Sequence, residues 1–182
     1  MNWLCCALSN RTKVQTIHLM NLKNMHKDSA NSYLFYIDQL VKQSAPNREQ
    51  PLVLIPRFPP DERRCVASTL EEYLARTAPL KRGGGDQVFL SFIRPLKRVS
   101  KDAISRWIKH VMHLPGVDTK LFKSHSTRAA STSKVFDKIP LQSIMKSASC
   151  NDDCVFHKFY NKPVNEPNES ESFGHAILSA SA

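Results

Sequence analysis

The hydrophobic positions of this 182-residue chain recur at helical spacing over most of its length. The clearest case follows Ser100, a residue type that favours helix N-caps, and ends before Pro115-Gly116. Its apolar residues stand at i, i+3, i+4 and i+7: Ile104, Trp107, Ile108 and Val111. The same reasoning predicts further helices over residues 1–11, over residues 14–22, after Pro59-Pro60-Asp61, after Ser124 as a cap, from Pro140 onward, and over residues 152–160.

Two runs of β-branched and aromatic residues interrupt the helical pattern. Residues 33–37 and 52–55 are separated by a polar turn region that contains Lys42, so we expect two antiparallel strands. A third short strand is predicted at residues 88–90. The glycines at 83–85 are interpreted as a linker, because no P-loop Lys-Ser/Thr follows them. The pattern as a whole predicts a mainly helical α+β domain with a small antiparallel sheet.

Of the bulk properties, net charge says most about the partner of this domain. The formal net charge is +10, and residues 161–182 carry one Lys and three Glu, a net of −2, which leaves a net charge of +12 on residues 1–160. A basic domain favours a polyanionic partner, nucleic acid first. A basic interaction protein of another kind is the alternative. Residues 164–182 are rich in Asn, Ser, Glu and Pro, and we expect them to form an extended or disordered tail.

Cysteine usage and hydropathy exclude several classes of protein. Five cysteines without a secretory signal peptide indicate reduced thiols, and Cys150-x3-Cys154-x2-His157 lacks a fourth ligand for zinc, so no metal site is expected. No apolar run approaches the ~18 residues of a membrane span. We therefore expect a nuclear or cytoplasmic protein that is neither secreted nor bound to a membrane.

Candidate chemistry is concentrated between Ser124 and Tyr160. His125 and Arg128 are three residues apart, so on a helix they project from one face, and Tyr160 follows 32 residues after Arg128. A guanidinium can hold two phosphate oxygens, an imidazole can move a proton, and a phenol can form a phosphate ester. This set suits phosphoryl transfer to a tyrosine.

Five segments carry a resemblance to a known family, and they span roughly residues 4–163. They are Lys13-Val-Gln-Thr-Ile-His-Leu, Lys42-Gln-Ser, Val99-Ser-Lys-Asp-Ala-Ile-Ser-Arg-Trp-Ile-Lys, Ser124-His-Ser-Thr-Arg-Ala-Ala-Ser-Thr-Ser and Phe156-His-Lys-Phe-Tyr-Asn-Lys-Pro. The pattern resembles the catalytic domain of tyrosine recombinases, the phage-integrase family, and within it the DIRS-like and Crypton-like eukaryotic mobile elements. The resemblance implies that family's catalytic-domain fold over residues 1–163, without the N-terminal DNA-clamp domain.

The resemblance also implies a reaction, DNA strand cleavage and rejoining through a 3′-phosphotyrosyl intermediate in recombination or integration. Tyr160 matches the nucleophile, Arg128 the second arginine, His125 the histidine before it, and Lys42 the mobile lysine that acts as general acid. No metal and no nucleotide cofactor is needed, because the covalent link stores the bond energy.

Two positions depart from the family pattern. Lys13 stands where the family has its first arginine, so the charge is kept but the planar bidentate fork is lost. Cys150 stands where the family has His or Trp, and a thiol is a weak hydrogen-bond donor. Losing one preorganised donor typically costs ~10²–10³ in rate. A catalytically inactive DNA-binding remnant is therefore the alternative function.

DNA is the partner that the resemblance implies, and we also expect a homo-oligomer on the DNA. Arg106 and Lys109 fall off the apolar stripe of their helix. Such charges usually face solvent, but here the resemblance implies backbone phosphate contacts. The residues predicted to bind DNA are Arg106, Lys109, Lys101 and Lys123.

Overall fold

The computed structural model describes residues 2–41, 44, 46, 50–81, 85–91, 93–94, 96–136, 138–147 and 156. Within these residues the helices are α1 (Asn2–Ser9), α2 (Val14–Leu19), α3 (Val66–Thr77), α4 (Lys101–His113), α5 (Ser126–Val135) and α6 (Leu141–Ser147), and the strands are β1 (Met25–Lys27), β2 (Tyr33–Tyr36) and β3 (Leu52–Ile55). The predicted α+β class with a small antiparallel sheet is confirmed. In the part of the chain so described, no helix combines the length and the apolar character that crossing a membrane requires.

The sheet is antiparallel throughout, with the strand order β1-β2-β3. Phe35 of β2 lies opposite Val53 of β3, and both side chains are buried, whereas their neighbours along each strand are more exposed. This alternation is the period of two that a sheet with one buried face requires. The two strands predicted from residues 33–37 and 52–55 are confirmed.

The third strand was predicted in the wrong place. Residues 88–90 form only isolated bridges at their borders, and their backbone bonds to irregular segments: Val88 N–H donates to Met20 O at 3.3 Å. Val88, Phe89 and Leu90 are apolar because they are buried in the core. The third strand is Met25–Lys27, a short edge strand whose composition gives no β signal.

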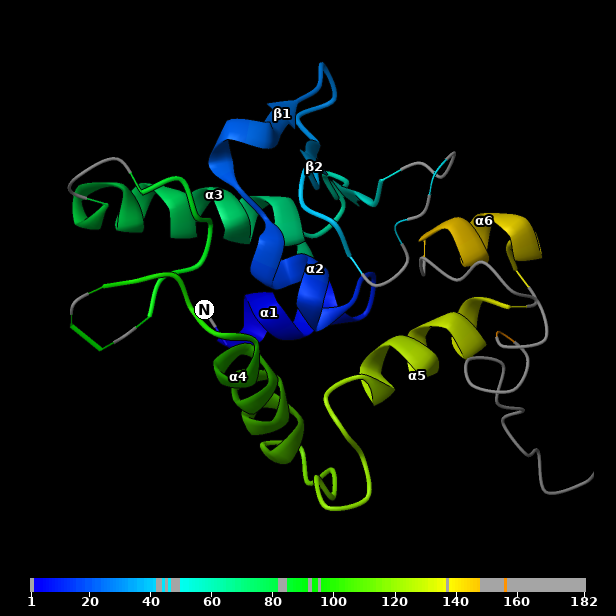
Figure 1. Cartoon of the computed structure of the whole chain (residues 1–182). Helices are drawn as coiled ribbons and strands as arrows, with labels where there is room; N and C mark the ends of the chain where they lie inside the picture. Colours follow the sequence, from blue (N-terminus) through cyan, green and yellow to red (C-terminus); the bar gives the residue numbers. More distant parts are fainter. Residues whose placement is uncertain are drawn as a thin grey trace, which may run out of the picture.

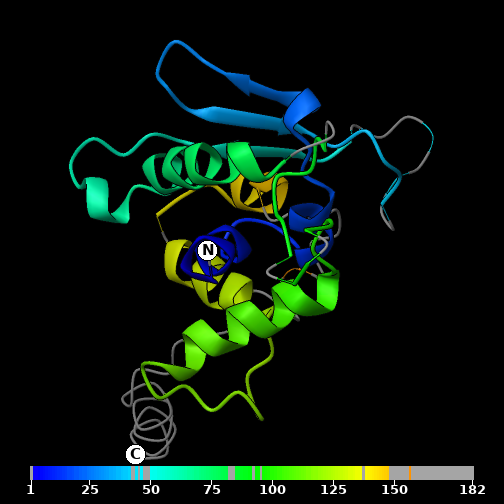
Figure 2. The same cartoon turned by 90° about the vertical axis from the view of Figure 1, so that its left-hand side faces the viewer.

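The main core lies on both sides of α1. Figure 2 shows the sheet, α3, α1 and α4 following one another from the top of the molecule to the bottom. Leu4 and Leu8 of α1 are fully buried, and so are Ile104 and Ile108 of α4 and Leu70 of α3. The stripe predicted for α4 is thus its core face, with Trp107 and Val111 at the borders and Met112 added to it.

The helix boundaries agree with the sequence-based prediction at one position and differ from it at others. The Ser100 side chain accepts a hydrogen bond from Ala103 N–H at 3.2 Å, which confirms the predicted N-cap of α4. The helix expected after Pro59-Pro60-Asp61 is confirmed as α3, but it begins later, at Val66, and a 3-10 turn, Glu62–Arg64, precedes it. Cys65 separates the two, and its sulfur accepts from Ser68 N–H at 3.5 Å. The segment predicted as a helix to residue 22 ends at Leu19.

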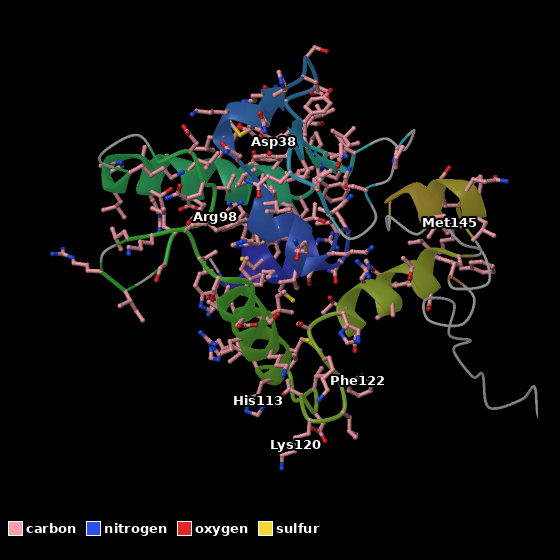
Figure 3. The ribbon with its side chains drawn as sticks, in the orientation of Figure 1. Asp38, Arg98, His113, Lys120, Phe122 and Met145 are labelled. Carbon is pink, nitrogen blue, oxygen red and sulfur yellow. The ribbon has the colours of Figure 1, made fainter. Side chains whose placement is uncertain are left out.

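A second, smaller apolar cluster lies beside α5 and α6. Ile144 and Phe156 are buried in it, and the half-buried residues packed against them are Val135, Phe136, Leu141 and Met145. The helix predicted from Pro140 is confirmed, and its Leu141, Ile144 and Met145 side chains face this cluster. Figures 1 and 3 show α6, with its labelled Met145, well separated from the lower end of α4. The tail at 164–182 and, apart from Phe156, the helix predicted over 152–160 lie outside the described residues.

Candidate functional site

A tight turn between α1 and α2 places Lys13. The backbone N–H groups of Arg11 and Thr12 both donate to Leu8 O, at 2.9 and 3.0 Å, so the chain reverses immediately after α1. Lys13 is the N-cap residue of α2, with extended backbone angles, and its carbonyl accepts from Ile17 N–H at 3.0 Å. The buried Leu8 and Ile17 anchor the two ends of this turn, so the position of Lys13 is set by the main core.

The start of α5 places His125 and Arg128. His125 is the N-cap residue, and Arg128 lies in the first turn with only 6% of its surface exposed. The predicted cap at Ser124 is wrong, because the hydroxyl that satisfies a backbone donor here belongs to Ser126, which accepts from Lys123 N–H at 3.1 Å. Ser124 is buried instead.

These segments meet at a pocket of about 190 Å³. Its lining residues come from the α1–α2 turn, from α4 and from the start of α5: Ser9, Thr12, Lys13, Val14, Ser105, Ser124, His125 and Arg128. The described lining combines two cationic side chains, one imidazole and four hydroxyls, and contains no carboxylate. Cations and hydroxyl donors in this combination suit a tetrahedral oxyanion such as a phosphate group.

The structure therefore brings together three of the six predicted catalytic residues, Lys13, His125 and Arg128. Lys42, Cys150 and Tyr160 lie outside the described residues. The catalytic role of all six stays a prediction. Sequence reasoning did not single out the hydroxyls of Ser9, Thr12 and Ser105, since isolated Ser and Thr residues in helices and turns carry no signal of their own.

A second contact fixes α2 against the segment before α4. Arg98 donates from Nε and Nη2 to the carbonyl oxygen of His18, at 2.9 and 2.6 Å, and His18 Nδ1 lies 2.8 Å from Val99 O. Because a carbonyl oxygen only accepts, Nδ1 carries the proton. Burial lowers the pKa of His18, so its ring is neutral at pH 7. Figure 3 shows Arg98 beside α2, above the start of α4.

Of the residues predicted to bind DNA, Lys101, Lys109 and Lys123 lie near pocket residues in the helix or the sequence, whereas Arg106 lies on another side of its helix. Lys101, Ser105 and Lys109 are four residues apart along α4, so they form one stripe, and Ser105 lines the pocket. Lys101 Nζ donates to Gln15 Oε1 at 3.3 Å, and the exposed Lys123 directly precedes the pocket residue Ser124. Arg106 is exposed but lies about 100° around the helix from Ser105.

The described residues offer neither a metal site nor a reactive thiol. Among the described residues, no three His, Cys, Asp or Glu side chains converge to hold a metal ion. Cys5, Cys6 and Cys65 are free thiols, and burial raises the pKa of Cys5 to about 12, so this thiol is protonated and unreactive at pH 7.

Comparison with known proteins gives evidence on the fold. No protein-family model and no curated protein sequence matches the chain. It is similar to a crystal structure of XerA recombinase, with 14% identity, a TM-score of 0.64, and coverage of 94% of this chain and 54% of that one. It is also similar to XerH site-specific recombinase bound to difH substrate in a pre-cleavage complex, with 11% identity, a TM-score of 0.66, and 94% and 45% coverage.

The post-cleavage complex of XerH with palindromic difH substrate gives 11% identity and a TM-score of 0.68, with 96% of this chain and 46% of that chain covered. The chain thus spans about half the length of these solved structures. The likeness shows that the chain has the fold of a tyrosine-recombinase catalytic domain. The likeness does not show that the chain belongs to the DIRS-like or Crypton-like branch, so this affiliation stays an expectation from the sequence.

Proposed function

We propose that this chain carries the catalytic site of a tyrosine recombinase and that it cleaves and rejoins DNA strands. The observation that carries the proposal is the pocket in which Lys13, His125 and Arg128 meet. Two further findings support it: the solved structures of this fold are recombinases, two of them in complex with a difH substrate, and residues 1–160 bear the whole positive excess.

In the proposed reaction the phenol oxygen of Tyr160 attacks the scissile phosphorus. The bond from phosphorus to the 5′ oxygen breaks, and the 5′ oxygen leaves as a hydroxyl with a proton from Lys42. Arg128 and Lys13 hold the non-bridging oxygens, where charge develops in the transition state, and His125 accepts the proton that the phenol of Tyr160 releases. Attack by a 5′-hydroxyl on the phosphotyrosyl bond reverses these steps and rejoins the strand.

Lys13 is the reason to propose a weakened enzyme. An ammonium supplies a point charge at the pocket, whereas the arginine of the family supplies two parallel donors. The same observation favours a second candidate function, a remnant that binds DNA through its basic surface and no longer cuts it. Under either function we propose a mobile-element origin, assembly as a homo-oligomer on DNA, and a nuclear location.

Suicide DNA substrates test the proposal. A nick placed beside the scissile phosphate lets the cleaved fragment diffuse away, so an active tyrosine stays covalently attached to DNA and the adduct survives denaturing electrophoresis. We expect a faint adduct with the native chain, a stronger one with Lys13→Arg plus Cys150→Trp, and none with Tyr160→Phe.

The controls separate cleavage from binding. Tyr160→Phe removes only the attacking oxygen, so its DNA affinity should equal that of the native chain. An adduct formed by Tyr160→Phe would show that another residue is the nucleophile. Salt-dependent DNA binding without an adduct, even in the Lys13→Arg plus Cys150→Trp chain, would favour the DNA-binding remnant.

A further inference from the structure

The way in which α5 is held against α1 differs from the rest of the molecule. The residues of α5 that are buried are Arg128 and Thr132, and both are polar. The apolar side chains at its far end, Val135 and the following Phe136, pack into the second cluster with Ile144. In the described part of the chain, the half of α5 that carries Arg128 therefore buries no apolar side chain of its own.

Hydroxyl groups make the contacts there instead. Thr127 Oγ1 lies 2.8 Å from Ser9 Oγ, a pair 118 residues apart in sequence. Ser131 Oγ donates to Asn10 O at 2.6 Å, across 121 residues. Ser9 Oγ also donates to Cys6 O at 2.6 Å, which uses its only proton. Thr127 Oγ1 also donates to Ser124 O at 3.1 Å, and Ser131 Oγ to Arg128 O at 2.9 Å. Each of these two hydroxyls is thus shared between a carbonyl of its own segment and a group at the end of α1.

The two contacts join the segment that carries Arg128 to the segment that leads to Lys13. Thr127 and Ser131 are four residues apart on one stripe of α5, and Arg128 lies between them. Their partners, Ser9 and Asn10, lie within the tight turn that places Lys13. Two contacts on one stripe oppose pivoting of α5 about a single contact point.

We propose that Thr127 and Ser131 are positioning residues, which set the placement of Arg128 and His125 relative to Lys13 for a bound phosphate group. The inference rests on the proposed function, because it assigns these hydroxyls a role in the same pocket. Neither hydroxyl is a lining group of the pocket. They act through Arg128 and His125, and a misplacement of about 1 Å in such a group is enough to cost up to about 10²-fold in rate.

The test replaces both hydroxyls in the full chain, as Thr127→Val plus Ser131→Ala. Two readouts are taken: adduct formation on suicide DNA at saturating DNA, and binding of inorganic phosphate followed by the amide NMR signals of Thr12 and Ser105. We expect adduct formation to fall at least about tenfold. Phosphate binding should weaken several-fold, while DNA affinity stays within about twofold because the exposed lysines are intact.

Two matched variants exclude a merely structural role. Thr127→Ser plus Ser131→Thr keeps both hydroxyls and should restore both readouts. Thr77→Val removes a buried hydroxyl that bonds only within α3, to Tyr73 O at 2.8 Å. It should lower thermal stability without changing phosphate binding. A Thr77→Val chain that loses phosphate binding as much as the double variant would overturn the proposal.

The two readouts also separate this inference from the proposed function. Phosphate binding that depends on the two hydroxyls, without an adduct from any variant, would leave the positioning role standing and remove the recombinase activity. Equal phosphate affinity and equal adduct rates in the native chain and the double variant would overturn the positioning role and leave the activity standing.

Discussion

The main core and α5 are held by different forces, although the candidate pocket needs both. Around α1, fully buried leucine and isoleucine side chains from α1 and α4 exclude water, and this core sets the position of Lys13. The half of α5 that carries Arg128 rests on hydroxyl contacts to Ser9 and Asn10. Hydrophobic burial is strong but tolerant of direction, whereas hydrogen bonds contribute little net free energy and fix geometry closely. Stability and pocket geometry should therefore be separable by mutation.

The largest effect on stability is expected from the core. Ile108→Ala removes a fully buried side chain between α4 and α1, and we expect the free energy of unfolding to fall by about 2–5 kcal/mol. Urea denaturation followed by circular dichroism measures it. Leu121→Ala, at a side chain that is 74% exposed, should change the value by less than about 0.5 kcal/mol. Equal losses in the two variants would contradict the described core.

The largest effect on catalysis is expected from α5. Arg128→Ala should lower the rate of adduct formation by about 10²–10³-fold, because it removes a preorganised donor from the pocket. Arg128→Lys should recover part of the charge but not the bidentate geometry. Single-turnover assays on suicide DNA give the rates, preferably in the Lys13→Arg plus Cys150→Trp background. An Arg128→Ala chain that cleaves at the unchanged rate would remove Arg128 from the site.

The sequence predicted the core region better than the placement of α5. The burial of Ile104 and Ile108 was predicted correctly, because four apolar residues at helical spacing leave only one face of the helix to bury. Residues 88–90 misled the prediction, because a short apolar run looks the same in an irregular buried segment as in a strand. Met25–Lys27 was missed because an edge strand of three residues takes its order from its neighbour β2.

For the candidate site, residues could be predicted from the sequence, but the contacts between them could not. Lys13, His125 and Arg128 were predicted from a family resemblance, and the pocket brings these three together. The contact from Ser9 to Thr127 joins residues 118 positions apart, and nothing in the local sequence distinguishes either one from any other serine or threonine. Only the folded chain shows which serines and threonines face each other.

A partly exposed polar network beside the main core gives a test of the comparison that depends on pH. Glu71 of α3 accepts hydrogen bonds from Lys27, Tyr33 and Arg57 at 2.6–2.7 Å, and these partners hold its pKa at about 2. A carboxyl group with a lowered pKa stabilises the fold above its unfolded value of 4.5, and the contribution is lost as the pH falls toward 2. Glu71→Gln should cost about 1 kcal/mol at pH 7.

The cost of Glu71→Gln should shrink between pH 4.5 and 2, as measured by thermal unfolding of both chains over that range. The hydroxyl contacts of Thr127 and Ser131 do not titrate there, so the stability loss of the Thr127→Val plus Ser131→Ala chain should stay constant with pH. A cost of Glu71→Gln that is independent of pH would contradict the network.

The smallest expected effect is on the salt dependence of DNA binding, and it concerns α4. This helix contributes residues both to the main core and to the pocket. Lys109 shares a stripe with the pocket residue Ser105, whereas Arg106 lies about 100° away. Lys109→Ala should reduce the slope of log affinity against log salt by about 1, the loss of one phosphate contact, and Arg106→Ala should reduce it less. Fluorescence anisotropy with labelled duplex DNA measures both slopes. A larger change for Arg106→Ala would place the DNA on another face of α4.

The most direct test of the account is the structure of this chain bound to a nicked DNA substrate. The account predicts that the scissile phosphate occupies the pocket, with its non-bridging oxygens within hydrogen-bond distance of Lys13 and Arg128 and with His125 beside them. A complex in which the DNA lies on another face and no phosphate enters this pocket would contradict it.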